Sequence, residues 1–125
     1  MDQVLALRPF VPARDFDLSQ RYYQALGFAV TLQDGQVAIL KQESFSFILQ
    51  NFYVKASAEN LMIQLMIQLM VRDGDAWWRA ADPARMAAEF DAPPPKPPAM
   101  QPWGMKVGFL TDPSGVLWRV AESLF

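Results

Sequence analysis

The order of the expected secondary-structure elements constrains the fold of this chain most, because a unit of strand, helix and three strands occurs twice. In the first half, Asp15 is a typical helix N-cap, and Gly27 is typical of the position just after a helix. Asp34-Gly35 is a typical hairpin turn. The first unit is therefore predicted as a strand at 4–11, a helix at 15–26, and strands at 28–32, 37–41 and 45–52.

The second half repeats this order after a polar connector at residues 53–60. A helix is expected from Gly74 to Phe90, and Pro83 within it predicts a kink or a division into two short helices. Residues 92–102 hold six of the ten prolines, which predicts a stiff extended loop and leaves one strand of this unit uncertain. The other strands are expected at 61–72, 105–110 and 116–121, the last two forming a hairpin around Asp112-Pro113-Ser114-Gly115.

The two units predict an α+β fold of two βαβββ modules. The length of 125 residues is that of a single domain, 1–125, with module 1 at about 1–55 and module 2 at about 60–125. Each module is expected to form a curved mixed sheet with a helix on its outer face, and the two sheets should enclose a cleft. A weak repeat supports this pairing, because Arg14-Asp15 precedes the first helix and Arg72-Asp73 precedes the second.

The composition argues against several classes of function. The chain has no cysteine and no histidine, so it offers no disulfide, no thiolate nucleophile and no histidine that could activate a serine. A net charge of −2, without a cluster of Lys and Arg, argues against a nucleic-acid partner. The amino terminus does not resemble a signal peptide, and the longest apolar run, 61–71, is too short to cross a membrane. We therefore expect a cytoplasmic protein with no nucleic-acid or membrane partner.

Residues 62–70 contain a second, local repeat, in which the unit Ile-Gln-Leu-Met occurs twice. Alternate side chains of a strand point to opposite faces, so the leucines and isoleucines would face the core. The other face would carry Met62, Gln64, Met66, Gln68 and Met70. A long strand with one partly solvated face explains this pattern, but the same face could line a ligand cleft, where methionine adapts to varied shapes. The repeat also leaves the register ambiguous, which could favour exchange of the strand between protomers.

Three motifs of this chain together carry a family resemblance. They are Pro12-Ala13-Arg14-Asp15, Tyr22-Tyr23-Gln24-Ala25-Leu26-Gly27-Phe28, and Gln101-Pro102-Trp103-Gly104 followed by Asp112-Pro113-Ser114-Gly115. They resemble the vicinal oxygen chelate superfamily of glyoxalases, bleomycin-resistance proteins and dioxygenases, and the third is most similar to the bleomycin-resistance branch. The resemblance covers nearly the whole chain. It implies paired βαβββ modules, a homodimer with clefts at the subunit interface, and a small aromatic ligand such as an antibiotic of the bleomycin type. The first strand, with Pro9 and Pro12 near its end, could be exchanged between the protomers.

In metal-dependent members of this superfamily, four positions on the sheet strands supply His, Glu or Gln ligands. The resemblance places these positions at Arg8, Gln50, Met66 and Arg119. Arginine has no lone pair to donate, methionine sulfur is a poor ligand for hard divalent ions, and only Gln50 could coordinate. We therefore predict no metal, no cofactor and no catalytic residue, and expect that the protein sequesters its ligand without converting it.

The residues predicted to contact the ligand are Trp103, Phe10, Gln50, Gln64, Met66, Gln68, Arg8 and Arg119. Trp103 is foremost among them because exposed aromatic residues on loops often serve binding. Phe45, Phe47 and Trp118 are assigned mainly to the core, because a small domain needs large apolar side chains to bury area.

Arg8 and Arg119 leave two interpretations open. If both face the cleft, they form a cationic site for a carboxylate, phosphate or sulfonate. The more conservative expectation is that each pairs with an Asp or Glu side chain at the rim.

Two alternatives to ligand sequestration also remain. The superfamily includes metal-dependent lyases and dioxygenases, and stoichiometric bound metal would favour such an enzyme. A degenerate homologue without a small-molecule ligand would instead have a cleft that its own side chains fill or that serves a protein partner.

Overall fold

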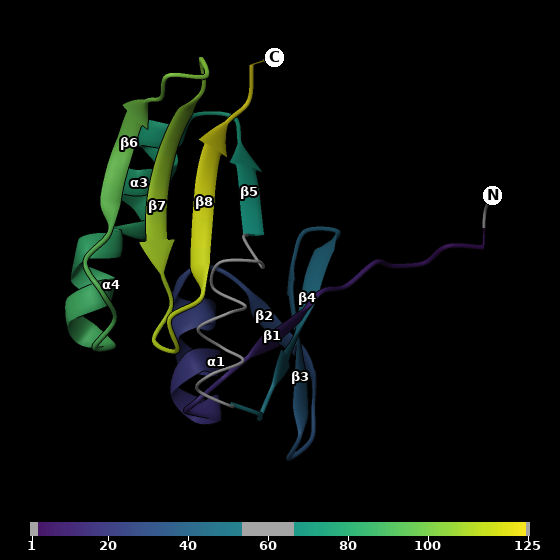
Figure 1. The fold of residues 1–125 in the computed structure, drawn as a ribbon. Helices are drawn as coiled ribbons and strands as arrows, with labels where there is room; N and C mark the ends of the chain where they lie inside the picture. The colour runs from purple at the N-terminus through teal and green to yellow at the C-terminus, as the bar shows by residue number, and fades with distance from the viewer. Residues whose placement is uncertain (1–2, 54–66, 125) are drawn as a thin grey trace.

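The computed structural model describes residues 3–53 and 67–124, which form two sheets and three helices (Figure 1). Module 1 contains β1 (Phe10–Pro12), α1 (Phe16–Ala25), β2 (Ala29–Gln33), β3 (Val37–Gln42) and β4 (Phe45–Gln50). Module 2 contains β5 (Ile67–Val71), α3 (Gly74–Ala81), α4 (Pro83–Glu89), β6 (Lys96–Met100), β7 (Lys106–Thr111) and β8 (Leu117–Glu122). The predicted repetition of one element order is confirmed. None of the helices in the described ranges is long and apolar enough to span a membrane.

Both sheets have the same topology. The strand order is β1-β4-β3-β2 in module 1 and β5-β8-β7-β6 in module 2. In each sheet the first strand of the module runs parallel to the last, and the other neighbours are antiparallel. Each sheet is therefore mixed, as predicted, and the first strand of each module lies at a sheet edge.

An aspartate begins the first helix of each module. Asp15 Oδ1 accepts a hydrogen bond from the Leu18 amide at 3.0 Å, and Asp73 Oδ1 accepts one from the Ala76 amide at 3.0 Å. These contacts satisfy backbone donors that the first helical turn leaves free. After α1, Gly27 has a φ of 103°, a conformation that residues with a Cβ rarely adopt.

Pro83 divides the second predicted helix in two, as its position in the sequence indicated. α3 ends at Asp82, whose backbone is left-handed with a φ of 50°, and Pro83 is the first residue of α4. Proline suits this position because the first helical amide has no partner within the helix. α3 packs closely on β7, because a Cβ added to Gly108 would lie 2.6 Å from Cζ3 of Trp78. Gly108 thus allows the Trp78 ring to lie directly on the sheet.

The first strand is shorter than predicted. β1 has three residues instead of the expected 4–11. Residues 3–9 precede it, and the first of them extend away from both sheets (Figure 1). The last of these, Pro9, accepts a hydrogen bond from the Ile48 amide at 2.9 Å. Pro9 and Pro12 have no amide proton, so this segment cannot continue a full ladder in either direction. Pro12 belongs to the strand, although it was expected to end it.

β6 lies within the proline-rich segment that was predicted to be an extended loop. It pairs with β7 at the edge of the sheet, and its register shifts between Lys96 and Ala99. Prolines are tolerated in an edge strand because a missing donor on the outer side, or at a bulge, costs no ladder hydrogen bond. The extended backbone was predicted correctly, but its pairing with β7 was not.

The two modules share one hydrophobic core. Tyr23 and Phe47 of module 1 have ring centroids 4.9 Å apart, and Phe47 lies 5.4 Å from Trp118 of module 2. The predicted core positions of Phe47 and Trp118 are confirmed, since these side chains are 3% and 5% exposed. The same prediction was wrong for Phe45, which is 69% exposed because it begins β4 at the rim of the sheet.

β5 is the described part of the strand predicted at 61–72, and the predicted ligand contacts Gln64 and Met66 lie outside the described residues. In β5, Gln68 and Met70 are exposed, whereas the alternate side chains are half-buried against the core. The predicted separation of a Met/Gln face from an aliphatic face is confirmed for this part of the strand.

Candidate functional site

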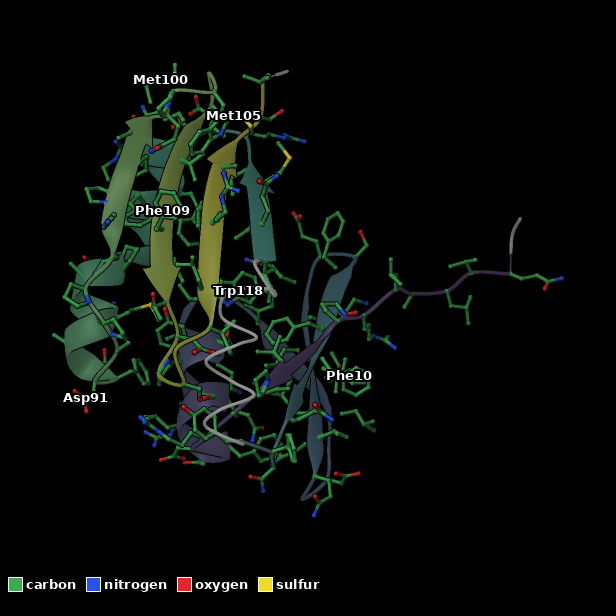
Figure 2. The ribbon with its side chains drawn as sticks, viewed as in Figure 1. Phe10, Asp91, Met100, Met105, Phe109 and Trp118 are labelled. Atoms are coloured by element: carbon green, nitrogen blue, oxygen red, sulfur yellow. The ribbon has the colours of Figure 1, made fainter. Side chains whose placement is uncertain are left out.

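An apolar cavity of about 370 Å³ lies between the two modules, and we call it the inter-module cavity. Phe47 and Trp118 from the shared core form part of its wall, with Trp118 at the end of β8 that lies toward module 1 (Figure 2). Its lining residues are Pro9, Phe28, Phe45, Ser46, Phe47, Ile67, Gln68, Leu69, Met70 and Trp118. A cavity of this size with aromatic walls and few polar groups suits a small, largely aromatic molecule.

A second cavity of about 460 Å³ adjoins the first. The two share Phe28, Phe45, Leu69 and Met70, and the second adds polar groups such as Glu43 and Arg72. Phe45, which was assigned to the core, is therefore a wall of both cavities. Phe45 is exposed because it lies between these two cavities. In the sequence, only the Phe-Ser-Phe alternation at 45–47 could have indicated that this residue lies on a wall of a site.

The described part of the Met/Gln face borders the cavity. Gln68 and Met70 are both lining residues of the inter-module cavity. The interpretation of this face as one wall of a ligand cleft is thus geometrically possible for β5.

The N-terminal residues of the predicted site lie at the rim or away from the cavity. Arg8 Nε donates a hydrogen bond to Oγ of Ser46, a lining residue, at 2.8 Å. Phe10 is 51% exposed on the other side of β1 from the core (Figure 2). Gln50 ends β4, where its carbonyl accepts the Ala13 amide at 2.9 Å. The structure therefore brings Arg8 to the rim, but Phe10 and Gln50 do not line the cavity.

Trp103 and Arg119 lie together on module 2. The guanidinium carbon of Arg119 is 5.3 Å from the ring centroid of Trp103 and 5.9 Å from that of Phe109. A cation over the face of an aromatic ring is attracted by the ring's quadrupole. We call these three residues the Arg119 cluster. Phe109 was not predicted, and the register of the β7–β8 hairpin places it opposite Arg119.

Gln68 joins the Arg119 cluster to the inter-module cavity. It lines the cavity and is also the neighbour of Arg119 across the β5–β8 pair. Within residues 3–53 and 67–124, neither Arg8 nor Arg119 forms an ion pair with an acidic side chain, so the conservative expectation for these arginines is wrong in that part of the chain.

A buried polar network holds module 2 against module 1. The Tyr23 hydroxyl donates to Asp112 Oδ2 at 2.6 Å and accepts from Trp118 Nε1 at 2.9 Å. Asp112 Oδ1 accepts the amides of Ser114 and Val116 at 2.9 and 2.8 Å. Burial raises the pKa of Asp112 to about 6, although these hydrogen bonds act to lower it. The Asp-Pro-Ser-Gly turn, which the sequence showed only as a hairpin turn, is therefore also a contact between the modules.

The positions that the resemblance assigns to metal ligands have other contacts here. Arg8 binds Ser46, Arg119 lies against two aromatic rings, and Met66 is outside the described residues. In the part of the chain that the structure describes, no group of three or more acidic side chains is arranged to hold a metal ion.

Comparison with known proteins gives relatives that cover nearly the whole chain. A bleomycin resistance protein from Klebsiella pneumoniae is 25% identical over 116 residues, which are 92% of this chain and 90% of that protein. No protein-family model matches the chain.

Solved structures share the fold. A bleomycin-binding protein from the bleomycin-producing Streptomyces verticillus, complexed with copper(II)-bleomycin, superposes with a TM-score of 0.76 at 20% identity, covering 98% of this chain and 99% of that chain. A lactoylglutathione lyase from Agrobacterium tumefaciens superposes with a TM-score of 0.63 at 15% identity, covering 97% and 96%. The predicted resemblance is confirmed: this chain is similar to a bleomycin resistance protein over nearly its whole length and shares its fold with a bleomycin-binding protein and a lactoylglutathione lyase.

Proposed function

We propose that this protein binds and sequesters a small, largely aromatic molecule without converting it, and that antibiotics of the bleomycin type are the first ligands to test. The observation that carries the proposal is the inter-module cavity, whose walls are aromatic and whose volume of about 370 Å³ suits such a ligand. The homologue is a bleomycin resistance protein, and a structural neighbour was solved with copper(II)-bleomycin, which supports this ligand class.

The Arg119 cluster extends this site along the sheet. Trp103 is 54% exposed although its ring contacts Arg119, so it is held in place and still accessible to a ligand. A ligand that spans the cavity and the cluster would contact Phe45 at one end and Trp103 at the other. Aromatic stacking at each end contributes about 0.5–1.5 kcal/mol beyond the area buried.

Isothermal titration calorimetry with bleomycin, copper(II)-bleomycin and a panel of aromatic antibiotics tests the proposal. Phe45→Ala and Trp103→Ala should each raise the dissociation constant about tenfold, which corresponds to about 1.4 kcal/mol. Phe52→Ala is a matched control, because Phe52 is 56% exposed and lines neither of the two cavities described above. Equal affinity of all four proteins would remove the cavity and Trp103 from the site.

The same titrations discriminate sequestration from catalysis. Saturable binding without added metal, with the ligand recovered unchanged, supports sequestration. Binding that needs a divalent metal, together with stoichiometric metal in the purified protein, would instead favour a lyase or dioxygenase.

We further propose that the protein acts in the cytoplasm as a homodimer. The first of residues 3–9 extend away from the sheets, and Leu5 and Leu7 are 96% and 92% exposed. Such apolar side chains are suited to burial against a second copy, because each would release ordered water on contact. Exchange of this segment and β1 between protomers is one way to bury them. Sedimentation equilibrium of the full chain, compared with a variant lacking residues 2–8, tests this arrangement.

A further inference from the structure

Among the described elements, no helix lies on one face of the module 2 sheet, and we call this face the helix-free face. Gly108 faces α3, because its missing Cβ would meet Trp78, and the register pairs Gly108 with Val120. Side chains alternate along a strand, so Arg119 points to the opposite, helix-free face. On that face a row of paired positions crosses the sheet from β5 to β6: Gln68, Arg119, Phe109 and Lys96.

The guanidinium of Arg119 stacks against two aromatic rings, and its Nε has no hydrogen-bond partner among the described residues. Its carbon lies 5.3 and 5.9 Å from the Trp103 and Phe109 ring centroids, and its Nε is buried. Ring stacking satisfies the charge but not the five N–H donors. Because Nε is buried, a ligand could reach this guanidinium only through its two terminal nitrogens, which carry four of its five N–H donors.

The setting of Arg119 keeps its guanidinium in position. Val107 and Ala121 follow on the same face of β7 and β8, and both are fully buried although they lie outside the main core. Larger side chains of this face therefore close over them. A group held by packing loses little conformational entropy when a ligand binds.

The acidic groups nearest in the fold are engaged elsewhere. Asp75 pairs with Lys106 on the helix-covered side, and Glu122 accepts the amide of Gly74 at 2.9 Å. Asp112 is buried with Tyr23. None of these three carboxylates pairs with Arg119, so within residues 3–53 and 67–124 no ion pair neutralises its charge, and Lys96 adds a second positive charge to the same row.

We propose that the aromatic ligand of this protein carries an anionic group, a carboxylate, sulfonate or phosphate, that binds the free edge of the Arg119 guanidinium. This inference rests on the proposed function and narrows its ligand class to aromatic molecules with an anionic group, so within the antibiotic panel it disfavours the cationic bleomycins. The guanidinium edge offers a two-point hydrogen-bonding fork to a planar or tetrahedral oxyanion. The aromatic part of the ligand then lies along Trp103 and Gln68 toward the inter-module cavity, and a ligand with only positive charge is disfavoured.

Three naphthalene probes of one shape test the charge preference: naphthalene-2-sulfonate, naphthalene-2-carboxamide and 2-naphthylmethylammonium. Binding to the ¹⁵N-labelled full chain is followed through the tryptophan indole N–H signals, with Trp103→Phe identifying the Trp103 signal. The sulfonate should bind at least tenfold more tightly than the ammonium probe and should shift the Trp103 signal. Its affinity should fall as salt is added, because exposed charge interactions are screened.

Arg119→Gln should abolish the preference for the sulfonate, raising its dissociation constant about tenfold. Arg79→Gln is the matched control, because it removes one positive charge from the exposed surface of α3. Arg119→Lys keeps the charge without the planar fork and should restore only part of the affinity, which keeps the test valid if the Gln variant folds poorly.

Equal binding of all three probes, or equal effects of Arg119→Gln and Arg79→Gln, would overturn the anionic preference while leaving aromatic binding intact. If the wild type bound none of the three probes and none of the antibiotics in the panel, the proposed function would be overturned as well.

Discussion

In the described part of the chain, the sheet faces opposite the helices differ between the two modules although the two sheets share one topology. In module 1 the row of paired positions across the sheet is Phe10, Ile48, Ile39 and Leu32, whereas in module 2 it is Gln68, Arg119, Phe109 and Lys96. The first row is wholly apolar, and its end members Phe10 and Leu32 are 51% and 57% exposed. An apolar row suits a protein surface, while a cationic and aromatic row suits a small anionic ligand. Duplicating a module thus repeats the scaffold but leaves each open face free to take its own role.

The helix-covered faces, by contrast, pack together into one core. Removing the hydrogen bonds that connect the two modules within this core should have the largest effect on stability. Tyr23→Phe removes the hydroxyl that bonds both Asp112 and Trp118, leaving two buried polar groups without this partner. We expect a loss of about 3–5 kcal/mol in the free energy of unfolding, measured by urea denaturation.

Tyr22→Phe is the matched control for this variant. Tyr22 is also buried, at 2% exposure, but its hydroxyl is not part of the Asp112 network. It should lose much less stability than Tyr23→Phe. Similar losses in both variants would mean that the network does not hold the modules together more strongly than ordinary packing.

The buried carboxyl of Asp112 should make stability depend on pH. Its pKa is raised from 3.8 to about 6 by burial, so between these values the unfolded chain ionises while the folded chain stays protonated. The free energy of unfolding therefore falls as pH rises through this window, by up to roughly 3 kcal/mol, and the contribution is constant above it. The Asp112→Asn variant has no carboxyl to titrate at this position, so its stability should lack this pH dependence. The urea midpoints of the wild type and of the variant should therefore converge as the pH rises. A difference between them that is independent of pH would contradict the raised pKa.

The sequence predicted the order of the helices and strands better than it predicted the contacts between distant parts of the chain. Caps such as Asp15 and turns such as Asp34-Gly35 act over a few residues, so the order of elements could be predicted from local patterns. The pairing of β6 could not, because its prolines favour a loop locally and only the edge position of the strand makes them acceptable. The contact of Asp112 with Tyr23 joins residues 89 positions apart, and no local pattern reports it.

The candidate site shows the same limit. Trp103 was predicted from its place on a loop, Arg119 from the resemblance and Gln68 from strand alternation. The structure brings them to adjoining strands or loops. Gln50 was included as one of the four positions that the resemblance assigns, and Phe10 as an aromatic residue on a predicted strand, but neither lines the inter-module cavity. Phe45 was assigned to the core by its size alone, whereas its position at the rim of β4 determines its exposure.

We expect the apolar row of module 1 to stabilise the proposed homodimer. This effect should be smaller than the contribution of the Tyr23–Asp112 network to the free energy of unfolding. Phe10→Ser and Leu32→Ser each remove an exposed apolar side chain from this row, and each should raise the dimer dissociation constant about tenfold. Sedimentation velocity over a range of concentrations measures this change. Phe52→Ser is the control, because Phe52 is similarly exposed but lies outside the row. A wild type that remains monomeric at every concentration would exclude the dimer.

The smallest effects should come from the feature that the modules share most closely, the aspartate that begins each first helix. Asp15→Ala and Asp73→Ala each remove one side-chain bond of 3.0 Å to a backbone amide, and each should cost about 1 kcal/mol. The two caps are far apart in the fold and share no partner, so the double variant should lose the sum of the two values. Asp→Asn at either position keeps an acceptor oxygen and should cost only a few tenths of a kcal/mol. If removing one cap lowered the free energy of unfolding several times more than removing the other, the two modules would differ in how strongly their first helices are stabilised. The modules would then share a backbone arrangement but not the energies of its contacts.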